Sequence, residues 1–312
     1  MPTGIGETHA CRPELDANER ALWKTLAADS AVWATEFRGS GHCAFWRRLI
    51  VIRSAVESQF DVLREALGNG LSLDAPTAAL ALEGRGFHGQ RSRPWSTRRG
   101  NLFLTVALPV GTRAAGLTVG LVMLPAVAVV DAIEAYNHKP TAPGIKWVND
   151  VLMRDRKVAG VLTATVCRGD RVEVALLGIG VNLEKTPPIE PTQFVRRAGC
   201  LKDLGVDVSL ERFTWTLLDR LAVRYRVLHE EGPGDLLESY RKASCIVGRR
   251  VRIWHESTDR VETDPGAESP PPLAAGVVQS IERDLSLRIE GCVHPVTRGR
   301  LALEEDCRRF GL

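Results

Sequence analysis

Apolar positions along the 312-residue chain fall into short uniform runs and into longer runs with helical spacing. The short runs predict strands at 49–52, 78–83, 102–110 and 171–183, with a hairpin over 144–167. The helical spacing predicts helices near 58–67, 115–136, 210–230 and 234–243. Strands interleaved with helices are typical of an α/β domain, which we expect to span 46–243.

The two ends of the chain follow other patterns. Residues 12–37 carry apolar and aromatic side chains at helical spacing, which predicts an N-terminal helical extension over 1–45. This extension lacks a basic recognition helix, so we do not expect a helix-turn-helix DNA-binding domain. Short strands over 244–312 fit a small β-barrel domain, with a polar, proline-rich insertion near 256–272 that we expect to be disordered.

Charge and cysteine content narrow the class of protein. The net charge of +3 is too small to imply a nucleic-acid or membrane partner. The seven cysteines are odd in number and include no Cys-x-x-Cys pair, which favours a reducing compartment over a disulfide framework or a zinc site. The longest uncharged run, 114–130, is too short to span a bilayer and is expected to be a buried helix. We therefore expect a cytoplasmic protein with no secretory signal.

A polar corner stands out between two apolar runs. Lys146-Trp147-Val148-Asn149-Asp150 turns into a strand, and Asp155-Arg156-Lys157-Val158-Ala159-Gly160 follows it. The lysines can meet an anionic ligand, and the absent side chain at Gly160 lets a flat ligand approach the backbone. An ordinary hairpin with charged turn residues is the alternative.

A loop rich in glycine and arginine lies upstream, over 84–99. Its glycines allow backbone N–H groups to turn toward a phosphate, and its five arginines can bind carboxylate or phosphate in bidentate fashion. We expect Trp95 to be an apolar lid that excludes water when the loop closes over a ligand. A solvated basic loop, or a nucleic-acid patch, is the alternative.

Together with Gly178-Ile179-Gly180-Val181-Asn182, these motifs occur in the order seen in biotin protein ligases. The chain resembles that family from about residue 48 to its C-terminus. The resemblance implies a central mixed β-sheet flanked by helices, as in class II synthetases, followed by a small SH3-like β-barrel. It implies biotin, ATP and Mg²⁺ as ligands. It also implies a two-step reaction: formation of biotinyl-5′-AMP and transfer of biotin to a lysine of a carboxylase carrier domain.

Three residues are expected to carry the chemistry. By resemblance, Lys157 contacts the biotin carboxylate and the α-phosphate, and Arg93 matches the last arginine of the family's loop motif. Asp150 is expected to contact the nucleotide or Mg²⁺, to accept hydrogen bonds from the pocket, or to assist the incoming carrier amine, and these roles stay open. The alternative for Lys157 is a surface lysine on a turn.

The resemblance also implies the remaining ligand contacts. The expected biotin site comprises Ser58, Gln59, Glu83, His88, Gly89, Gln90, Lys157, Gly160, Leu162 and Gly178. The expected ATP or adenylate site comprises Arg85, Arg91, Arg93, Trp95, Asn101, Lys146, Asn149, Val181 and Asn182. Candidate Mg²⁺ ligands are the oxygens of Asn149, Asp150 and Asn182.

The glycine–arginine loop departs from the family pattern Gly-Arg-Gly-Arg-x-Gly-Arg-x-Trp. Gly84-Arg85-Gly86 matches its start, but Trp95 then lies too far away. Counting back from Trp95 keeps the later spacing and places His88 and Gln90 at two arginine positions. In that register the neutral Gln90 replaces the arginine that holds the adenylate in the family. Either Arg91 or Arg85 compensates for it, or the intermediate is held less tightly, and weak retention is our hypothesis.

The site for the biotin ureido ring is also incomplete. The family glutamine that precedes the loop is absent, which leaves Glu83 and Arg85 as nearby polar candidates. Ser58-Gln59 matches the family's Ser-Thr-Asn/Gln only loosely, and an N-cap role for Ser58 is an alternative.

Two other functions compete with biotin ligation. One is a lipoate or octanoate ligase on the same fold, and the other is a catalytically weakened relative that binds a ligand or nucleic acid. The intact Lys-Trp-x-Asn-Asp motif and the short tail favour biotin, and retention of Lys157, Asn149, Asp150 and Asn182 favours turnover. Nucleic acid is therefore not the expected partner. The sequence leaves open the identity of the carrier and whether the protein forms a homodimer.

Overall fold

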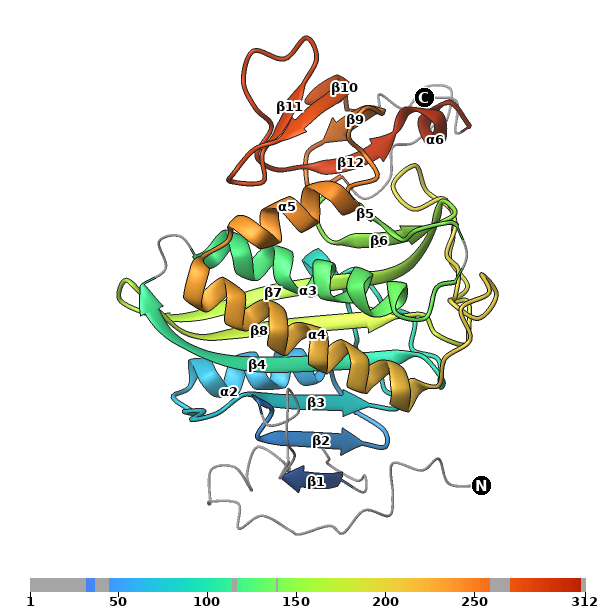
Figure 1. Cartoon of the computed structure of the whole chain (residues 1–312). Coiled ribbons are helices and arrows are strands. Elements are labelled where there is room, and N and C mark those ends of the chain that lie inside the picture. Colours follow the sequence, from blue (N-terminus) through green and yellow to red (C-terminus); the bar gives the residue numbers. More distant parts are fainter. Residues whose placement is uncertain (1–31, 37–44, 114–116, 139, 259–269, 310–312) are drawn as a thin grey trace.

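The computed structural model of the chain describes residues 32–36, 45–113, 117–138, 140–258 and 270–309 (Figure 1). Most of the expected N-terminal helical extension lies outside these residues. The part that is described, Val32–Glu36, is a strand (β1) that pairs antiparallel with Arg48–Ile52 (β2). The prediction of helix at 32–36 is therefore wrong. Residues 32–36 instead form an edge strand next to β2, which contains the apolar run Leu49–Ile52.

An eight-stranded sheet forms the centre of the molecule, in the order β1-β2-β3-β4-β8-β7-β6-β5. β2 and β3 pair in parallel and the other neighbours pair antiparallel, so the expected mixed sheet is confirmed. The predicted hairpin over 144–167 is three successive strands. The remaining bounds are β3 (Thr77–Ala81), β4 (Leu102–Arg113), β5 (Gly144–Lys146), β6 (Asp150–Met153), β7 (Arg156–Arg168) and β8 (Arg171–Val181).

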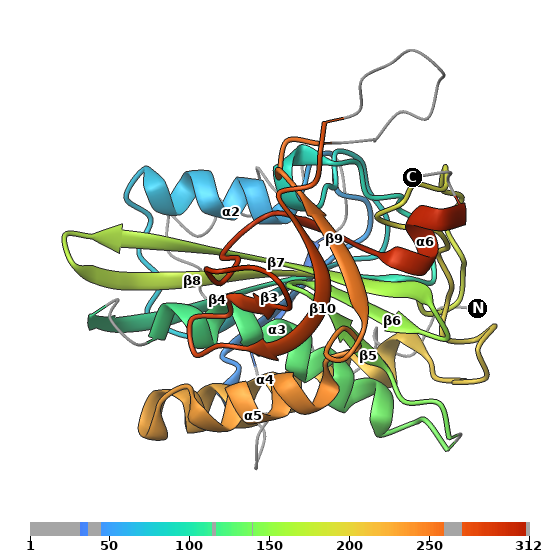
Figure 2. The same ribbon diagram turned by 90° about the horizontal axis from the view of Figure 1, so that it is seen from above.

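Helices cover both faces of this sheet (Figure 2). α2 (Gln59–Gly68) lies on one face, and α3 (Leu117–Glu134), α4 (Leu210–Glu231) and α5 (Gly234–Ala243) lie on the other. Among the helices described, α3 is long and apolar enough to cross a membrane, but most of it is buried against α4, α5 and the sheet. It is the core helix that its uncharged sequence predicts.

A second, smaller sheet contains β9 (Arg250–Trp254), β10 (Ala274–Ile281), β11 (Leu287–Ile289) and β12 (Arg300–Leu303), followed by α6 (Glu304–Arg309). Its strands are antiparallel in the order β11-β10-β9-β12. Within the residues described, β11 and β12 are the edges of an open sheet, so the expected closed barrel is not confirmed. Residues 259–269 of the expected insertion lie outside the part of the chain that the structure describes.

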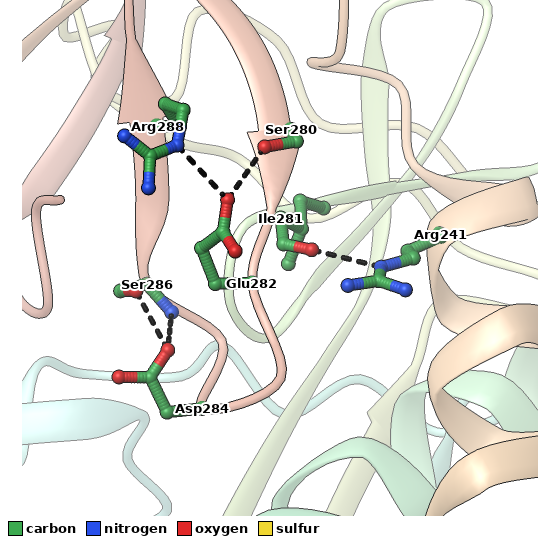
Figure 3. A network of polar contacts seen from close by, with 7 residues as sticks. All are labelled: Arg241, Ser280, Ile281, Glu282, Asp284, Ser286 and Arg288. Atoms are coloured by element: carbon green, nitrogen blue, oxygen red, sulfur yellow. Dashed lines mark hydrogen bonds and ion pairs between the residues drawn. The ribbon is translucent and has the colours of Figure 1, made fainter.

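Hydrogen bonds fix the turn between β10 and β11 and fasten it to the larger domain (Figure 3). The Asp284 carboxylate accepts from the backbone N–H of Ser286 at 3.0 Å and from its hydroxyl at 2.6 Å. Arg241, on α5, donates from Nε to the carbonyl of Ile281 at 2.8 Å. The small sheet is therefore docked by specific contacts next to α5, at the end of the larger domain that carries β5 and β6 (Figure 1).

Candidate active site

A cavity of about 600 Å³ opens at one end of β7 and β8, within the size range of small-molecule sites. Its walls come from distant parts of the sequence: the start of α2, the loop 87–96, the corner 146–150, the loop 187–198 and the start of β12. The corner, the loop and the Gly-x-Gly strand that the sequence singled out therefore meet around one space.

Most of the predicted site residues line this cavity. They are Ser58, Gln59, His88, Gly89, Gln90, Arg91, Arg93, Trp95, Lys146, Asn149, Asp150, Lys157, Gly160, Leu162, Gly178 and Asn182.

Four predicted residues do not line the cavity. Val181 points into the core of the sheet, paired with neighbours on β4 and β7. Asn101 is buried, and its side chain bonds the backbone of Glu184 and Lys185. Glu83 and Arg85 are exposed and lie outside the cavity lining. Position in a motif did not reveal which way these side chains face.

Lys157 and Asp150 form an ion pair in the cavity wall. The Nζ of Lys157 lies 2.7 Å from Oδ1 of Asp150, and each side chain is about four-fifths buried. Neighbouring strands hold the pair, because β6 starts at Asp150 and pairs with β7 just after Lys157. The Lys157 ammonium also lies 5.3 Å from the ring centre of Trp95. A cation and a carboxylate are therefore held at one fixed place in the wall.

The indole of Trp95 packs against two glycines of the sheet. A Cβ added at Gly160 would lie 2.9 Å from Cζ3 of Trp95, and one added at Gly180 would lie 2.8 Å from Cε2. Only glycine leaves room for the ring at these positions. Within the part of the chain described, the indole Nε1 is buried and has no hydrogen-bond partner.

The start of α2 presents unused polar atoms to the cavity. The Nε2 of Gln59 donates to the Phe103 carbonyl at 2.8 Å, but its Oε1 is buried with no partner among the described residues. Ser58 occupies the N-cap position of α2, yet its hydroxyl makes no capping hydrogen bond. Ser58 is therefore the N-cap residue by its backbone position, as the alternative predicted, but its side chain does not cap the helix.

Lys146 is engaged by the protein itself. Its side chain is buried, and its Nζ donates to the carbonyl of Phe194. Burial lowers the pKa of Lys146. The ring of Phe194 is in turn covered by the guanidinium of Arg300 at 3.8 Å. Lys146 thus fastens the loop 187–198 to the sheet and is not an open cation for a nucleotide.

His88 anchors the glycine–arginine loop to α2. Its Nε2 lies 2.5 Å from Oδ2 of Asp61, and its Nδ1 lies 2.9 Å from the carbonyl of Gly89. Burial by itself would lower the pKa of His88, but the Gly89 carbonyl and the Asp61 carboxylate together hold it above its ordinary value. His88 thus provides a contact to α2 that strengthens when its ring is protonated.

The loop itself folds into a tight hairpin. The backbone N–H of Trp95 donates to the Phe87 carbonyl at 2.9 Å, and that of Gly89 donates to the Arg93 carbonyl at 2.8 Å. Arg91 lies at the tip with a φ of 56°, in the left-handed region. This hairpin brings Trp95 over the sheet and directs Arg91 and Arg93 toward the small C-terminal sheet.

The predicted metal ligands do not form a preformed cage. Among the described residues no group of three or more His, Cys, Asp or Glu side chains could hold an ion. The amide nitrogen of Asn182 donates to the Gly199 carbonyl at 3.0 Å, while its Oδ1 is buried with no partner among the residues that the structure describes. Asn149 donates to the Val161 carbonyl at 2.9 Å. The cavity therefore offers scattered oxygens and not a complete coordination shell.

Comparison with known proteins identifies the family. The sequence model of the biotin/lipoate A/B protein ligase family matches residues 60–182. A biotin–[acetyl-CoA-carboxylase] ligase of Mycobacterium tuberculosis is 33% identical over 253 residues, which cover 78% of this chain and 82% of that protein. The chain belongs to the biotin protein ligases.

Other relatives agree with this assignment. The bifunctional ligase/repressor BirA of Bacillus spizizenii is 27% identical over 69% of this ligase, which spans only 62% of that longer protein. The biotin protein ligase of Aquifex aeolicus, solved in complex with biotin and ATP, aligns with a TM-score of 0.61 at 20% identity. The alignment covers 82% of this ligase and 98% of that chain. At that identity the structural likeness supports the fold alone.

Sequence reasoning missed several residues of the ligase cavity. Gly180 lies two residues after Gly178 on β8, and the period of two along a strand could have placed both on one face. Phe194 and Arg300 also line the cavity, but no local motif marks them. They reach it only because the loop after β8 and the small sheet fold back onto the larger domain.

Proposed function

We propose that this ligase activates biotin with ATP to form biotinyl-5′-AMP and pyrophosphate, and then transfers biotin to a lysine amine of a carboxylase carrier domain with release of AMP. The observation that carries the proposal is the Lys157–Asp150 pair beside the Trp95-covered Gly160 and Gly180. It lies in one cavity of a chain that is 33% identical to a named biotin ligase.

The first step must bring two anions together. The biotin carboxylate attacks the α-phosphorus of ATP, and at a separation of about 4 Å two unit charges repel by roughly 4 kcal/mol at an effective dielectric near 20. The fixed ammonium of Lys157 supplies the compensating charge where the new bond forms. Arg93, from the loop, lies on the same cavity and can bind a phosphate oxygen in bidentate fashion.

The buried end of the cavity suits a small polar ring attached to an apolar body. The unpaired Oε1 of Gln59 can accept from a ureido N–H, and the uncommitted hydroxyl of Ser58 can donate to the ureido carbonyl. Gly160, Leu162 and Gly178 give the wall an apolar surface beside that ring. Gln90 and Gly89 lie on the loop side of the same cavity.

The second step needs a neutral amine and a dry site. The carrier lysine must lose a proton before its nitrogen attacks the mixed anhydride, and Asp150 is the carboxylate placed to accept it. The Trp95 indole covers the sheet at this point and keeps water from the adenylate. Asp150 thereby assists the transfer step while Lys157 acts in the first.

Mg²⁺ fits this site as a partner of the triphosphate. Mg²⁺ is usually held by one or two carboxylates, with phosphate and water completing its shell. Asp150 supplies one such carboxylate, and the free Oδ1 of Asn182 and the side chain of Asn149 supply neutral oxygens. The ion would neutralise charge on the phosphates.

Several finer features complete the proposal. We propose that the small sheet belongs to an SH3-like domain, and that the protein works in the cytoplasm with biotin, ATP and a carrier domain as its partners. Lipoate is the competing substrate because the family model covers both biotin and lipoate ligases. The polar atoms of Gln59 and Ser58 favour biotin, because lipoate has no ureido group to satisfy them.

Isotope exchange between pyrophosphate and ATP tests the proposal. The ligase is incubated with ATP, Mg²⁺ and labelled pyrophosphate, first with biotin and then with lipoate. We expect label to enter ATP with biotin and not with lipoate. If label enters ATP with lipoate but not with biotin, or with neither of the two acids, biotin activation is rejected.

A further inference from the structure

Two arginines of the loop that closes the cavity contact one residue of the small C-terminal domain, Glu256. The guanidinium of Arg91, through Nη2, pairs with the carboxylate of Glu256. Arg93 donates from Nη2 to the backbone carbonyl of the same residue at 2.9 Å. Glu256 lies in the turn just after β9, more than 160 positions along the chain from either arginine.

The turn that carries Glu256 is held in place by contacts with β12 and with the loop 187–198. Arg300, the first residue of β12, donates from Nη1 to the carbonyl of Thr258, and its guanidinium covers the ring of Phe194. Trp254, at the end of β9, meets the same ring edge-on at 5.7 Å between centroids. The turn is therefore supported by the cavity's own loop 187–198.

The small sheet in turn is docked on the larger domain at the opposite end. The indole Nε1 of Trp147, in the polar corner, donates to the Leu285 carbonyl at 2.8 Å, and both side chains are buried. With the contact from Arg241 to Ile281, this fixes the sheet relative to the corner that carries Asp150 (Figure 3). The position of Glu256 is thus fixed relative to the larger domain, because the small sheet that carries it is docked there.

We propose that Glu256 is a positioning residue that latches the glycine–arginine loop shut and so slows escape of the bound adenylate. This inference rests on the proposed function, because it concerns how long that intermediate stays. Glu256 acts through Arg91 and Arg93, and need not touch the ligand. The small sheet thereby contributes to retention of the intermediate.

The latch has a specific electrostatic signature. The Arg91 and Glu256 side chains are 49% and 34% exposed, so dissolved salt screens their attraction. Exposed pairs of this kind are worth up to about 1 kcal/mol, which corresponds to a change of about two- to fivefold in a rate of escape. The backbone contact from Arg93 does not depend on the Glu256 carboxylate and survives its neutralisation.

Release of the adenylate tests the latch. The ligase is loaded with labelled biotin, ATP and Mg²⁺, freed of excess ligand by gel filtration, and followed without carrier. We expect Glu256→Gln and Arg91→Gln each to release biotinyl-AMP about two- to fivefold faster at low salt, and the double variant no faster than either single variant. The difference from wild type should vanish at about 1 M salt.

A matched control uses another exposed pair on the small sheet. Arg250 and Glu290 approach to 4.0 Å with both side chains more than half exposed, and neither residue lines the cavity. Glu290→Gln should leave release unchanged. Unchanged release in Glu256→Gln would overturn the latch. So would additive effects in the double variant, because Arg91 would then act on the ligand directly.

A second measurement needs no turnover. Amide hydrogen exchange over 87–95 should be faster in Glu256→Gln than in wild type at low salt, with biotin and ATP absent. Equal exchange would overturn the latch even if adenylation succeeds. Faster exchange in a protein that makes no adenylate would support the latch and reject the proposed function, so the two ideas fail separately.

Discussion

Replacing Lys157 with alanine is the sharpest test of how the first step works. The ammonium lies 2.7 Å from Asp150 and 5.3 Å from the centre of the Trp95 ring, in a side chain that is 20% exposed. It is therefore a fixed positive charge in the cavity wall, and we place the biotin carboxylate beside it. Alanine removes this charge and leaves the carboxylate of Asp150 unpaired beside two further anions.

The magnitude follows from the charges involved. One unit charge about 4 Å from an oppositely charged group contributes roughly 4 kcal/mol at a dielectric near 20. Asp150 already shares the ammonium, so we take a smaller loss of at least about 2.7 kcal/mol, which lowers the rate of adenylation about 100-fold. The loss should appear in kcat, because the charge acts where the new bond forms.

Biotin-dependent exchange of pyrophosphate into ATP measures this rate directly. Lys202→Ala serves as the control, because Lys202 is exposed and lies outside the cavity lining. Urea unfolding of both variants shows whether either has lost its fold. Exchange within a few-fold of wild type in folded Lys157→Ala would refute the assignment of Lys157.

Three further changes test other parts of the site. Gly180→Ala places a Cβ 2.8 Å from Trp95 and should raise the KM for biotin about tenfold. Gly68→Ala, with open space around the new Cβ, should leave that KM unchanged. Equal KM values for Gly180→Ala and wild type would contradict the packing of Trp95 on Gly180. Because the folded pKa of His88 is raised, its contribution to stability is present below about pH 6.5 and is lost as the pH rises through that pKa. The wild-type protein should therefore have a higher free energy of unfolding than His88→Gln, and the difference should be larger at about pH 5.5 than at about pH 9. A difference that does not change with pH would refute this role of His88. Gln90→Arg adds a cation to the loop and should slow adenylate release about fivefold, whereas equal release rates would remove the idea that Gln90 weakens retention.

Local sequence patterns predicted the elements that carry the site. The corner from Lys146 to Gly160 is contiguous in sequence, and its charges and glycine need only two short turns to face one cavity. The strands and helices of the larger domain begin and end within a few residues of their predicted bounds, because their apolar periods match their burial. Such features depend on neighbours along the chain.

Features that depend on distant partners could not be predicted. Residues 32–36 fit a helical spacing, but β2 offers an edge on which they form a strand instead. Lys146 is a cation in a motif, yet its partner is a carbonyl 48 positions away, which no local pattern reveals. The pairing of Arg91 with Glu256 likewise exists only because the small sheet docks beside the loop.

The mass of a carrier domain tests the central claim most directly. The ligase is incubated with ATP, Mg²⁺, biotin and the biotin-accepting domain of a carboxylase, and the domain is then analysed by mass spectrometry. We predict the gain of one biotinyl group on a single lysine, dependent on both ATP and biotin. An unchanged mass with folded ligase and folded carrier, or a lipoyl group gained in preference when both acids are supplied, would contradict the account.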